Sequence, residues 1–417
     1  MGLIYLEQYT MIQKILPIAA LTFVNMLGFT ILIPVLPFII QQYDVNQVYY
    51  GILLSSYAAF QFFGAPLLGS LSDIYGRKPI LIISQLGTLL SWVVFLIAYF
   101  IPESIHIMST PLPIIIIALA RVIDGITGGN NSVANAYMTD IIKPSERANA
   151  FGILGAAMGI AMIVGPAIGG YTASFSIGYL GTTLAAILIS TVTLIIMIVG
   201  LSETHTPNYN MKNQPFQIFK QFNLISKINK YRQNHFIALI LNMRVITLIA
   251  FSGYISIVVL FMIDRFGLNE RELSIALLIV GSYFIINQAF MVKRFVTRFG
   301  DRKTLMISHV LMMIGIIAVA LSPNLIIFLA VYYILNLGIA LSISTFKALL
   351  SRGAKPENQG EIMGLDESLM AASTAIMPII IVGIYTSLQA ITFYILATVI
   401  AASLVLAWIK RDVFYSL

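Results

Sequence analysis

The chain has 417 residues, of which 59% are hydrophobic and only 10% are charged. This composition excludes an ordinary soluble protein, which needs a charged exterior, and predicts a chain that uses lipid as its main solvent. The absence of cysteine excludes disulfides, thiolate metal sites and cysteine nucleophiles. We expect the net charge of +7 to mark cytoplasmic loops rather than a nucleic-acid interface.

Twelve apolar runs follow one another along the chain, each long enough to cross a bilayer core of roughly 30 Å. Lipid cannot satisfy free backbone groups, so each run is predicted to be a helix, and the lack of strand-type alternation disfavours a β-barrel. The first run lacks the features of a signal peptide and is predicted to be an uncleaved span. The predicted spans are residues 15–41, 48–72, 79–101, 112–139, 147–172, 177–201, 245–264, 272–293, 304–322, 324–347, 363–387 and 389–409.

Lysine and arginine gather in alternate connections, which predicts the direction of threading. The even-numbered connections hold Arg77, Lys78, Lys143, Arg147, Lys212, Lys220, Lys227, Lys230, Arg232, Lys293, Arg294, Arg298, Arg302, Lys303, Arg352 and Lys355. The odd-numbered connections hold only Arg265 and Arg271. We therefore expect the even connections and both termini to face the cytoplasm.

A short charged segment joins the second and third spans and reads Gly69-Ser-Leu-Ser-Asp-Ile-Tyr-Gly-Arg-Lys-Pro79. Its glycines permit a tight turn and a close helix approach. Asp73 can accept hydrogen bonds from a helix N-terminus, where the dipole favours an anion, and Arg77 can form a bidentate pair with Asp140. The alternative interpretation treats Arg77 and Lys78 as ordinary basic residues of a cytoplasmic loop.

A weaker echo of this segment, Arg298-Phe-Gly-Asp-Arg-Lys303, follows the eighth span. Six plus six spans with charged segments in corresponding places are typical of duplicated halves. We predict an all-α membrane protein with twelve transmembrane helices in two pseudo-symmetric six-helix bundles. The bundles are placed at residues 1–201 and 245–417, joined by a basic cytoplasmic loop at 202–244 that is interpreted as a solvated linker rather than a contact with anionic lipid.

The fourth span carries polar residues at steps of three, four, three and four, which place them on one face of a helix. These residues are Arg121, Asp124, Gly128, Asn131 and Asn135. Charges inside an apolar segment are costly in lipid and are expected to face a cavity. Arg121 and Asp124 can reach one another, either as a pair that responds to protons and substrate or as a compensated internal ion pair.

Other polar residues inside the spans are candidates for the same cavity or for hydrogen bonds between helices. They are Tyr57 and Gln61 in span 2, Asn287 and Gln288 in span 8, and Asn336 in span 10. Asp366 and Glu367 are interpreted as ordinary carboxylates at the start of span 11. Arg244 and Lys347 lie near predicted span ends and are expected to extend toward the cytoplasmic interface.

The motifs together resemble the major facilitator superfamily, in particular its twelve-span drug:proton antiporters related to tetracycline exporters, over essentially the whole chain. The matching positions are Gly69, Asp73, Gly76, Arg77 and Lys78 in the first segment, Arg121-x3-Gly125 with Ala136-Tyr137-x2-Asp140 in span 4, Gly165-Pro166-x2-Gly169-Gly170 in span 5 and Pro34-Val35-Leu36-Pro37 in span 1. The resemblance implies that the first segment and Asp140 form a cytoplasmic latch between the bundles.

In span 5, the small residues Gly165, Gly169 and Gly170 with Pro166 allow a neighbouring helix to approach closely. A packing role and a transport role are both open, and the resemblance implies both. The chain departs from the family in two places. Ala161 stands where relatives often have glycine, and Asn25 stands where relatives commonly have an acid.

Asparagine cannot titrate, so the usual proton carrier of span 1 is missing at Asn25. Asp124 occupies a position where many relatives have a small residue, and it is the candidate to take over the carboxylate role. Burial and the neighbouring Arg121 would act on it in opposite directions. Asn25 is thus a candidate residue of the proton and substrate cavity. Because it cannot titrate, transport without proton coupling is an alternative.

The sequence contains no Walker phosphate loop, and its four histidines have no metal-ligand spacing. We therefore predict no enzyme, no cofactor and no metal site. The expected partners are a small-molecule substrate, protons as the coupling ion and the lipid bilayer, without nucleic acid. A monomer is expected because the two halves already form one unit.

We predict a secondary transporter of the bacterial inner membrane that exports a small amphipathic, drug-like compound in exchange for protons by alternating access. The alternative, motivated by Asn25, is uptake or facilitated diffusion of a metabolite or siderophore by the same fold. A third hypothesis is a membrane receptor that does not transport, and the intact latch residues argue against it.

Overall fold

The computed structural model describes residues 2–142, 147–204, 228–355 and 358–414. Across these ranges the helices are joined by turns and short loops, and the only strands form a short antiparallel hairpin of β1 (His106–Ile107) and β2 (Thr110–Pro111). The predicted all-α membrane fold is confirmed, with this hairpin as an addition. The loop residues Lys143, Lys212, Lys220 and Lys227 and most of the predicted loop 202–244 lie outside the described residues.

The chain divides into two compact units, Met1–Phe219 and Lys220–Leu417. The helices of the first unit are α1 (Gly2–Thr30), α2 (Leu36–Gln42), α3 (Val48–Tyr75), α4 (Arg77–Tyr99), α5 (Leu112–Gly128), α6 (Asn131–Ile141), α7 (Arg147–Ala173) and α8 (Tyr179–Gly200). Those of the second unit are α11 (His235–Phe266), α12 (Glu270–Ile286), the π-helix η3 (Asn287–Met291), α13 (Val292–Ala320), α14 (Leu325–Gly353), α15 (Gln359–Leu388), α16 (Ile391–Ile409) and α17 (Arg411–Phe414).

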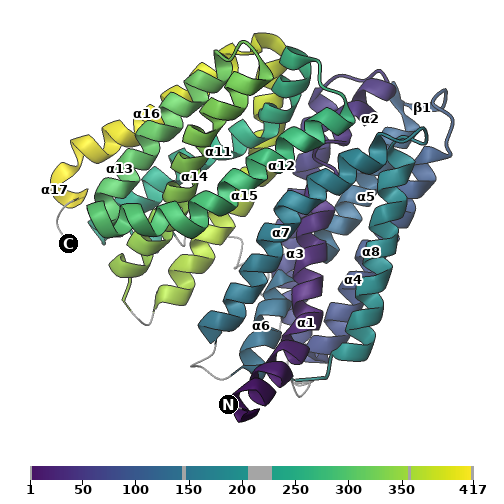
Figure 1. The fold of residues 1–417 in the computed structure, drawn as a ribbon, viewed down its shortest axis with the longest axis horizontal. Helices are drawn as coiled ribbons and strands as arrows, with labels where there is room; N and C mark the ends of the chain where they lie inside the picture. The colour runs from purple at the N-terminus through teal and green to yellow at the C-terminus, as the bar shows by residue number, and fades with distance from the viewer. Residues whose placement is uncertain (1, 143–146, 205–227, 356–357, 415–417) are drawn as a thin grey trace. The chain divides into compact units, whose positions relative to one another are not determined.

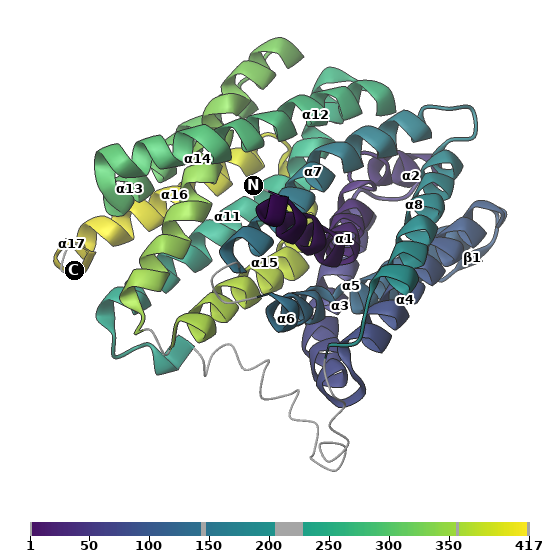
Figure 2. The same cartoon turned by 60° about the horizontal axis from the view of Figure 1, so that its bottom comes forward.

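In the first unit, α5 packs against both α3 and α4, and α1 packs against α7 and α8. In the second unit, α13 and α14 run side by side (Figures 1 and 2), while α11 packs against α15 and α16. Helices in lipid associate through close packing and interhelical hydrogen bonds rather than through a hydrophobic driving force. The polar residues described below lie at these helix contacts.

Ten helical stretches within the described residues are long and apolar enough to cross a membrane. One of them, Glu270–Ala320, is 51 residues long and covers both predicted spans 8 and 9, while the apolar part of α1, Ile15–Thr30, is shorter than a full span. Large apolar side chains such as Val199 and Ile326 are more than three-quarters exposed, at 82% and 80%, as expected for contact with lipid. The chain is a multi-pass membrane protein, and the count of twelve spans stays a prediction.

The two charged segments are largely helical, which corrects the expectation of polar loops. Helix α3 continues through Tyr75, and only Gly76, with φ 100° and ψ 158°, separates it from α4. Within α13 the helix bends at Gly300, with φ 73° and ψ 166°. Only glycine adopts such backbone angles readily, so these two residues make both turns. The polar residues before each glycine still belong to the helix. Hydropathy indicates which part of a helix lies in lipid, but it does not indicate where the helix ends.

Three other boundaries differ from the predicted spans. The run 15–41 is broken, because α1 ends at Thr30 and α2 begins at Leu36 with a proline in its first turn. Span 4 is divided where α5 ends at Gly128 and α6 begins at Asn131. Helix α11 begins at His235 rather than near residue 245.

Candidate functional site

A buried ion pair lies in the middle of α5. Arg121 contacts the Asp124 carboxylate one helical turn away, and both side chains are at most 5% exposed. The guanidinium of Arg121 also lies 3.4 Å from the carbonyl oxygen of Gly28 on α1 and 4.8 Å from the ring centre of Tyr57 on α3. Two charges removed from water require close pairing and additional hydrogen bonds. Helices α1 and α3 therefore hold the pair that the sequence predicted.

Helix α4 completes the surroundings of this pair. The Trp92 ring centre lies 6.0 Å from the Arg121 guanidinium, and the hydroxyl groups of Thr88 and Ser91 are hydrogen-bonding neighbours of Asp124. Nε of Arg121 is buried and has no hydrogen-bond partner among the described residues. A buried donor without a partner is rare and marks a place where water or a ligand can bind. The pair thus has unused hydrogen-bonding capacity.

Two further predicted cavity residues, Tyr57 and Gln61, lie beside this ion pair. Gln61 donates from Nε2 to the Tyr57 hydroxyl at 3.1 Å and to the carbonyl oxygen of Gly128 at 3.2 Å. Of the predicted polar face, Arg121, Asp124 and Gly128 are buried, Asn131 is half-buried and Asn135 is exposed. The face is interrupted because the helix breaks after Gly128, which the spacing argument did not anticipate.

Asn25 takes part in a chain of buried polar groups. Its Nδ2 donates to Oδ1 of Asn130 and lies 3.4 Å from Oδ1 of Asn131, and Asn130 donates to Ser84 Oγ at 2.7 Å. Asn130 is fully buried and was missed by the sequence reasoning, although its position beside Asn131 was a signal. Asn25 therefore links α1 to the break between α5 and α6, and through Asn130 to α4.

The three polar residues predicted for the second half meet at the π-helix η3. Asn287 donates from Nδ2 to Oδ1 of Asn336 on α14 at 3.2 Å, and Gln288 donates to Ser344 Oγ at 3.0 Å. Asn336 also lies 3.4 Å from the carbonyl oxygen of Val280. Single π-helical turns are often found at functional sites. This cluster joins η3 to α14 within the second unit.

A second buried ion pair lies in the second unit and corrects the interpretation of Arg244 and Asp366. Arg244 donates from Nε and Nη2 to the two carboxylate oxygens of Asp366 at 2.6 and 3.2 Å. The two side chains are 3% and 1% exposed, and the guanidinium lies 5.3 Å from the ring centre of Phe346. Arg244 does not extend to the interface, because α11 begins at His235 and carries Arg244 inside the helix. Lys347, by contrast, forms a largely exposed pair with Glu367.

The predicted latch residues come together at the ends of α3, α4 and α6. Arg77 donates from Nη1 to Ser72 Oγ at 2.6 Å and to Asp73 Oδ1 at 2.5 Å, and its Nε lies 3.4 Å from Oδ2 of Asp140. The contact with Asp140 is through a single nitrogen, not bidentate as expected. Gly69 lies inside α3, opposite the Ser132 side chain, rather than in a turn.

The carboxylate at the start of α4 is Glu203, not Asp73. Glu203 accepts hydrogen bonds from the backbone N–H groups of Arg77 at 2.9 Å and Lys78 at 3.2 Å. Asp73 cannot do this because it lies in the last turn of α3. Lys78 Nζ donates to the carbonyl oxygen of Leu201 at 2.6 Å, at the end of α8. Glu203 was missed because it lies 126 positions from Arg77 and carries no local motif.

The small residues of α7 pack against α1. A methyl group on Gly165 would lie 2.0 Å from Thr30 Oγ1, and one on Gly169 would lie 1.9 Å from the carbonyl oxygen of Ile31. The Thr30 hydroxyl lies 3.0 Å from the carbonyl oxygen of Ala161 on the same face. Pro166 and Gly170 are buried in the same helix, which Pro166 does not interrupt. A close helix contact within the first unit thus requires the absence of side chains at the two glycines.

Comparison with known proteins agrees with this arrangement. A family model described as Major Facilitator Superfamily matches residues 18–378 and 288–416. The chain is 27% identical to the class C tetracycline resistance protein of Escherichia coli over 91% of each chain, and 27% identical to the class H protein of Pasteurella multocida over 90% of this chain and 89% of the relative. A crystal structure of the human organic anion transporter MFSD10 has a TM-score of 0.68 at 18% identity, covering 94% of this chain and 98% of the other, and shows a shared fold.

Proposed function

The chain belongs to the Major Facilitator Superfamily and is a secondary transporter rather than an enzyme; from this premise we propose that it exports a small amphipathic organic compound in exchange for protons. The relatives named as tetracycline resistance proteins support export of a drug-like compound. The even connections and both termini face the cytoplasm in this proposal, and transport proceeds by alternating access. The protein acts as a monomer in the inner membrane.

The observation that carries the proposal is the Arg121–Asp124 pair on α5. Asp124 is a buried carboxylate whose principal partner is one arginine, and Asn25 on α1 cannot titrate. Protonation of Asp124 removes its charge and weakens its hold on Arg121. Arg121 is then free to bind a polar group of the substrate while Tyr57 and Trp92 contact the apolar part.

The latch residues supply the conformational part of the proposal, and the bonds described for them join helices within the first unit. Arg77 lies at a turn that only glycine makes easily, and it bonds to groups on α3 and α6. Bonds of this kind break and form as helices shift, so they hold one state of the transporter without fixing it permanently. Gly165 and Gly169 keep α7 close to α1 during that movement.

The proposal is tested by measuring transport in everted membrane vesicles across which a pH gradient is imposed. Tetracycline and the amphipathic dye ethidium are the probes. We expect gradient-driven accumulation of at least one probe, and loss of that accumulation when the gradient is collapsed. Equal rates with and without the gradient contradict proton coupling, and no flux of either probe contradicts export of drug-like compounds. Replacement of exposed Asp412 by Asn serves as the control for loss of one carboxylate.

Asn25 supports one alternative function, facilitated diffusion or uptake. Its bonds to Asn130 and Asn131 are those of a structural amide, and asparagine cannot titrate, so the position where relatives commonly carry an acid has no titrating group here. Under this alternative, intact cells that produce the protein accumulate the transported probe instead of excluding it. Comparison of probe content in cells with and without the protein separates the two directions.

A further inference from the structure

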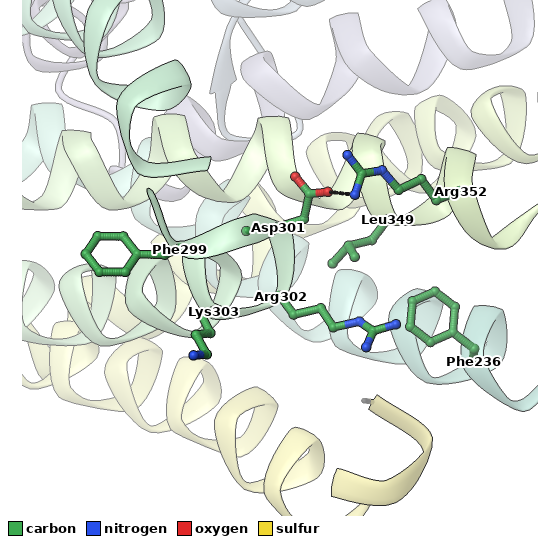
Figure 3. A pocket seen from close by; sticks show the side chains of 8 residues that line it. Phe236, Phe299, Asp301, Arg302, Lys303, Leu349 and Arg352 are labelled. Atoms are coloured by element: carbon green, nitrogen blue, oxygen red, sulfur yellow. Dashed lines mark ion pairs between the residues drawn. The ribbon is translucent and has the colours of Figure 1, made fainter. Parts of the chain in front are cut away.

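A cavity of about 430 Å³ lies at the bend of α13, away from the polar residues considered above (Figure 3). The first turn of the helix after Gly300 forms one wall, and Phe236 and Leu349 form buried apolar parts of the lining. The ring of Phe299 also lines the cavity and is 38% exposed. The cavity therefore combines a helix start with apolar surface, within the second unit alone.

The charges that line the cavity are mainly positive. Arg302, Lys303 and Arg352 give three positive charges against the single carboxylate of Asp301, a net charge of +2. That carboxylate is almost fully buried and is paired with Arg352 at 2.6 Å, so its charge is already compensated (Figure 3). Arg302 extends toward Phe236, with its guanidinium 5.5 Å from the ring centre. The cavity has the sign of charge that attracts an anion.

The corresponding place in the first unit holds an anion supplied by the chain itself. Gly76 and Gly300 share the same unusual backbone angles, and each is followed by a basic helix start. After Gly76, the Glu203 carboxylate accepts hydrogen bonds from two backbone N–H groups of that start. A helix N-terminus favours a negative charge through its unsatisfied N–H groups and its dipole. After Gly300, the same feature opens into the cavity.

We propose that this cavity binds the phosphate group of an anionic phospholipid. Phosphate matches both the basic side chains and the helix start, and Arg302 and Lys303 are the residues that contact it. The lipid form is favoured over free phosphate because exposed aromatic rings precede the bend, Phe299 in α13 and Phe290 in η3, and can contact acyl chains. This connection is among those predicted to face the cytoplasm, where basic pockets between helices bind anionic headgroups.

The test measures retention of phosphatidylglycerol by the purified full-length protein, using native mass spectrometry after reconstitution in mixed phosphatidylcholine and phosphatidylglycerol nanodiscs. We expect the double variant R302Q/K303Q to bind phosphatidylglycerol about thirtyfold more weakly, because each basic residue near an anionic surface contributes favourably. Arg352 is left unchanged because its removal would leave Asp301 buried without a partner. The matched control R265Q/R271Q removes two exposed arginines from a different connection and should change retention less than twofold.

The single variant K303Q keeps the proposal testable if the double variant folds poorly. Lys303 is exposed, so its replacement should leave the thermal unfolding temperature unchanged while weakening lipid binding about fivefold. Retention that is the same in all variants would overturn the site. Equal competition by inorganic phosphate at the same concentration would overturn the lipid assignment and leave free phosphate as the ligand.

Discussion

Among the described residues, each unit contains one arginine–aspartate pair in which both side chains are buried, and the two pairs are built differently. Arg121 and Asp124 lie one turn apart on the single helix α5, whereas Arg244 on α11 pairs with Asp366 on α15. Each guanidinium also lies over an aromatic ring, Tyr57 in one case and Phe346 in the other. A pair within one helix can open without moving any helix, but a pair between helices fixes how they pack.

The hydrogen bonds of the two pairs differ in the same sense. Arg244 binds both oxygens of Asp366 through two nitrogens, a geometry that adds strength and orientation. Arg121 leaves its Nε without a partner among the described residues. We therefore propose a structural role for the pair in the second unit and a reactive role for the pair in the first. Variants for which stability and transport are measured separately can test these two roles.

The largest effect on stability is expected for Arg244→Met. It leaves the Asp366 carboxylate buried without a cation, and loss of one partner of a buried pair costs about 3–5 kcal/mol. The double variant R244M/D366L removes both charges and should regain most of that loss. Unfolding free energy in detergent micelles is the measurement. A single variant that is no less stable than the double variant contradicts the structural role.

Asp124→Asn should act mainly on transport. We expect gradient-driven flux per folded protein to fall more than tenfold, because the amide cannot carry a proton. Its unfolding free energy should fall by about 1–3 kcal/mol, less than for Arg244→Met, because Arg121 keeps its contacts with Gly28 and Tyr57.

Asp366→Asn is the matched variant for this comparison. It should lower the amount of folded protein while leaving the flux per folded molecule within twofold. Vesicle transport and quantification of folded protein by size-exclusion chromatography give the two readouts. Loss of gradient-driven flux in D366N but not in D124N would exchange the roles of the two pairs.

The contrast between the pairs also shows what the sequence could predict. The Arg121–Asp124 contact follows from a spacing of three residues on one helix, so local geometry was sufficient. The Arg244–Asp366 contact joins residues 122 positions apart, and it depends on how α11 and α15 pack. No property of either residue alone indicates that partner. From the sequence we therefore expected Arg244 to extend to the cytoplasmic membrane interface, as an arginine near a span end usually does.

For the fold, too, local features could be predicted from the sequence and features that depend on packing could not. Apolar runs identified the helices, because lipid requires length and hydropathy in the same segment. The breaks after Thr30 and after Gly128 were not predicted, because hydropathy continues across them. The glycines of the first charged segment predicted a tight turn, which the structure places at Gly76, whereas the turn at Gly300 was not predicted. Tertiary packing decided that Glu203 would fill only the first turn.

These two turns give a further way to compare the units. At Gly76 an added methyl group would lie 2.5 Å from Glu203 Oε2, whereas at Gly300 it would meet no atom within 4 Å. Gly300→Ala should therefore cost only the strain of backbone angles that are almost exclusive to glycine, about 1–3 kcal/mol. Gly76→Ala should carry the same strain and cost about 1 kcal/mol more, because it also displaces the carboxylate that caps α4.

Thermal unfolding of the two alanine variants beside the unchanged protein measures this difference. The variant G76A/E203Q serves as the control, because the carboxylate charge at the helix start is then already absent. Equal losses at Gly76 and Gly300 would contradict the view that Glu203 fills the first turn. A larger loss at Gly300 would show that the cavity in the second unit tolerates less change than its size indicates.

The smallest effect is expected for Glu367→Gln, one residue along α15 from the buried Asp366. The Glu367 carboxylate lies 2.8 Å from Lys347 Nζ, but these side chains are 60% and 46% exposed. Water and salt screen such a pair, so the variant should change the unfolding free energy by less than about 0.5 kcal/mol. Because Glu367 and Asp366 share one turn of the same helix, a comparable loss in E367Q and D366N would place the effect in the α15 backbone. A loss of stability confined to D366N would show that the effect comes from the buried carboxylate charge, as a structural role of the Arg244–Asp366 pair requires.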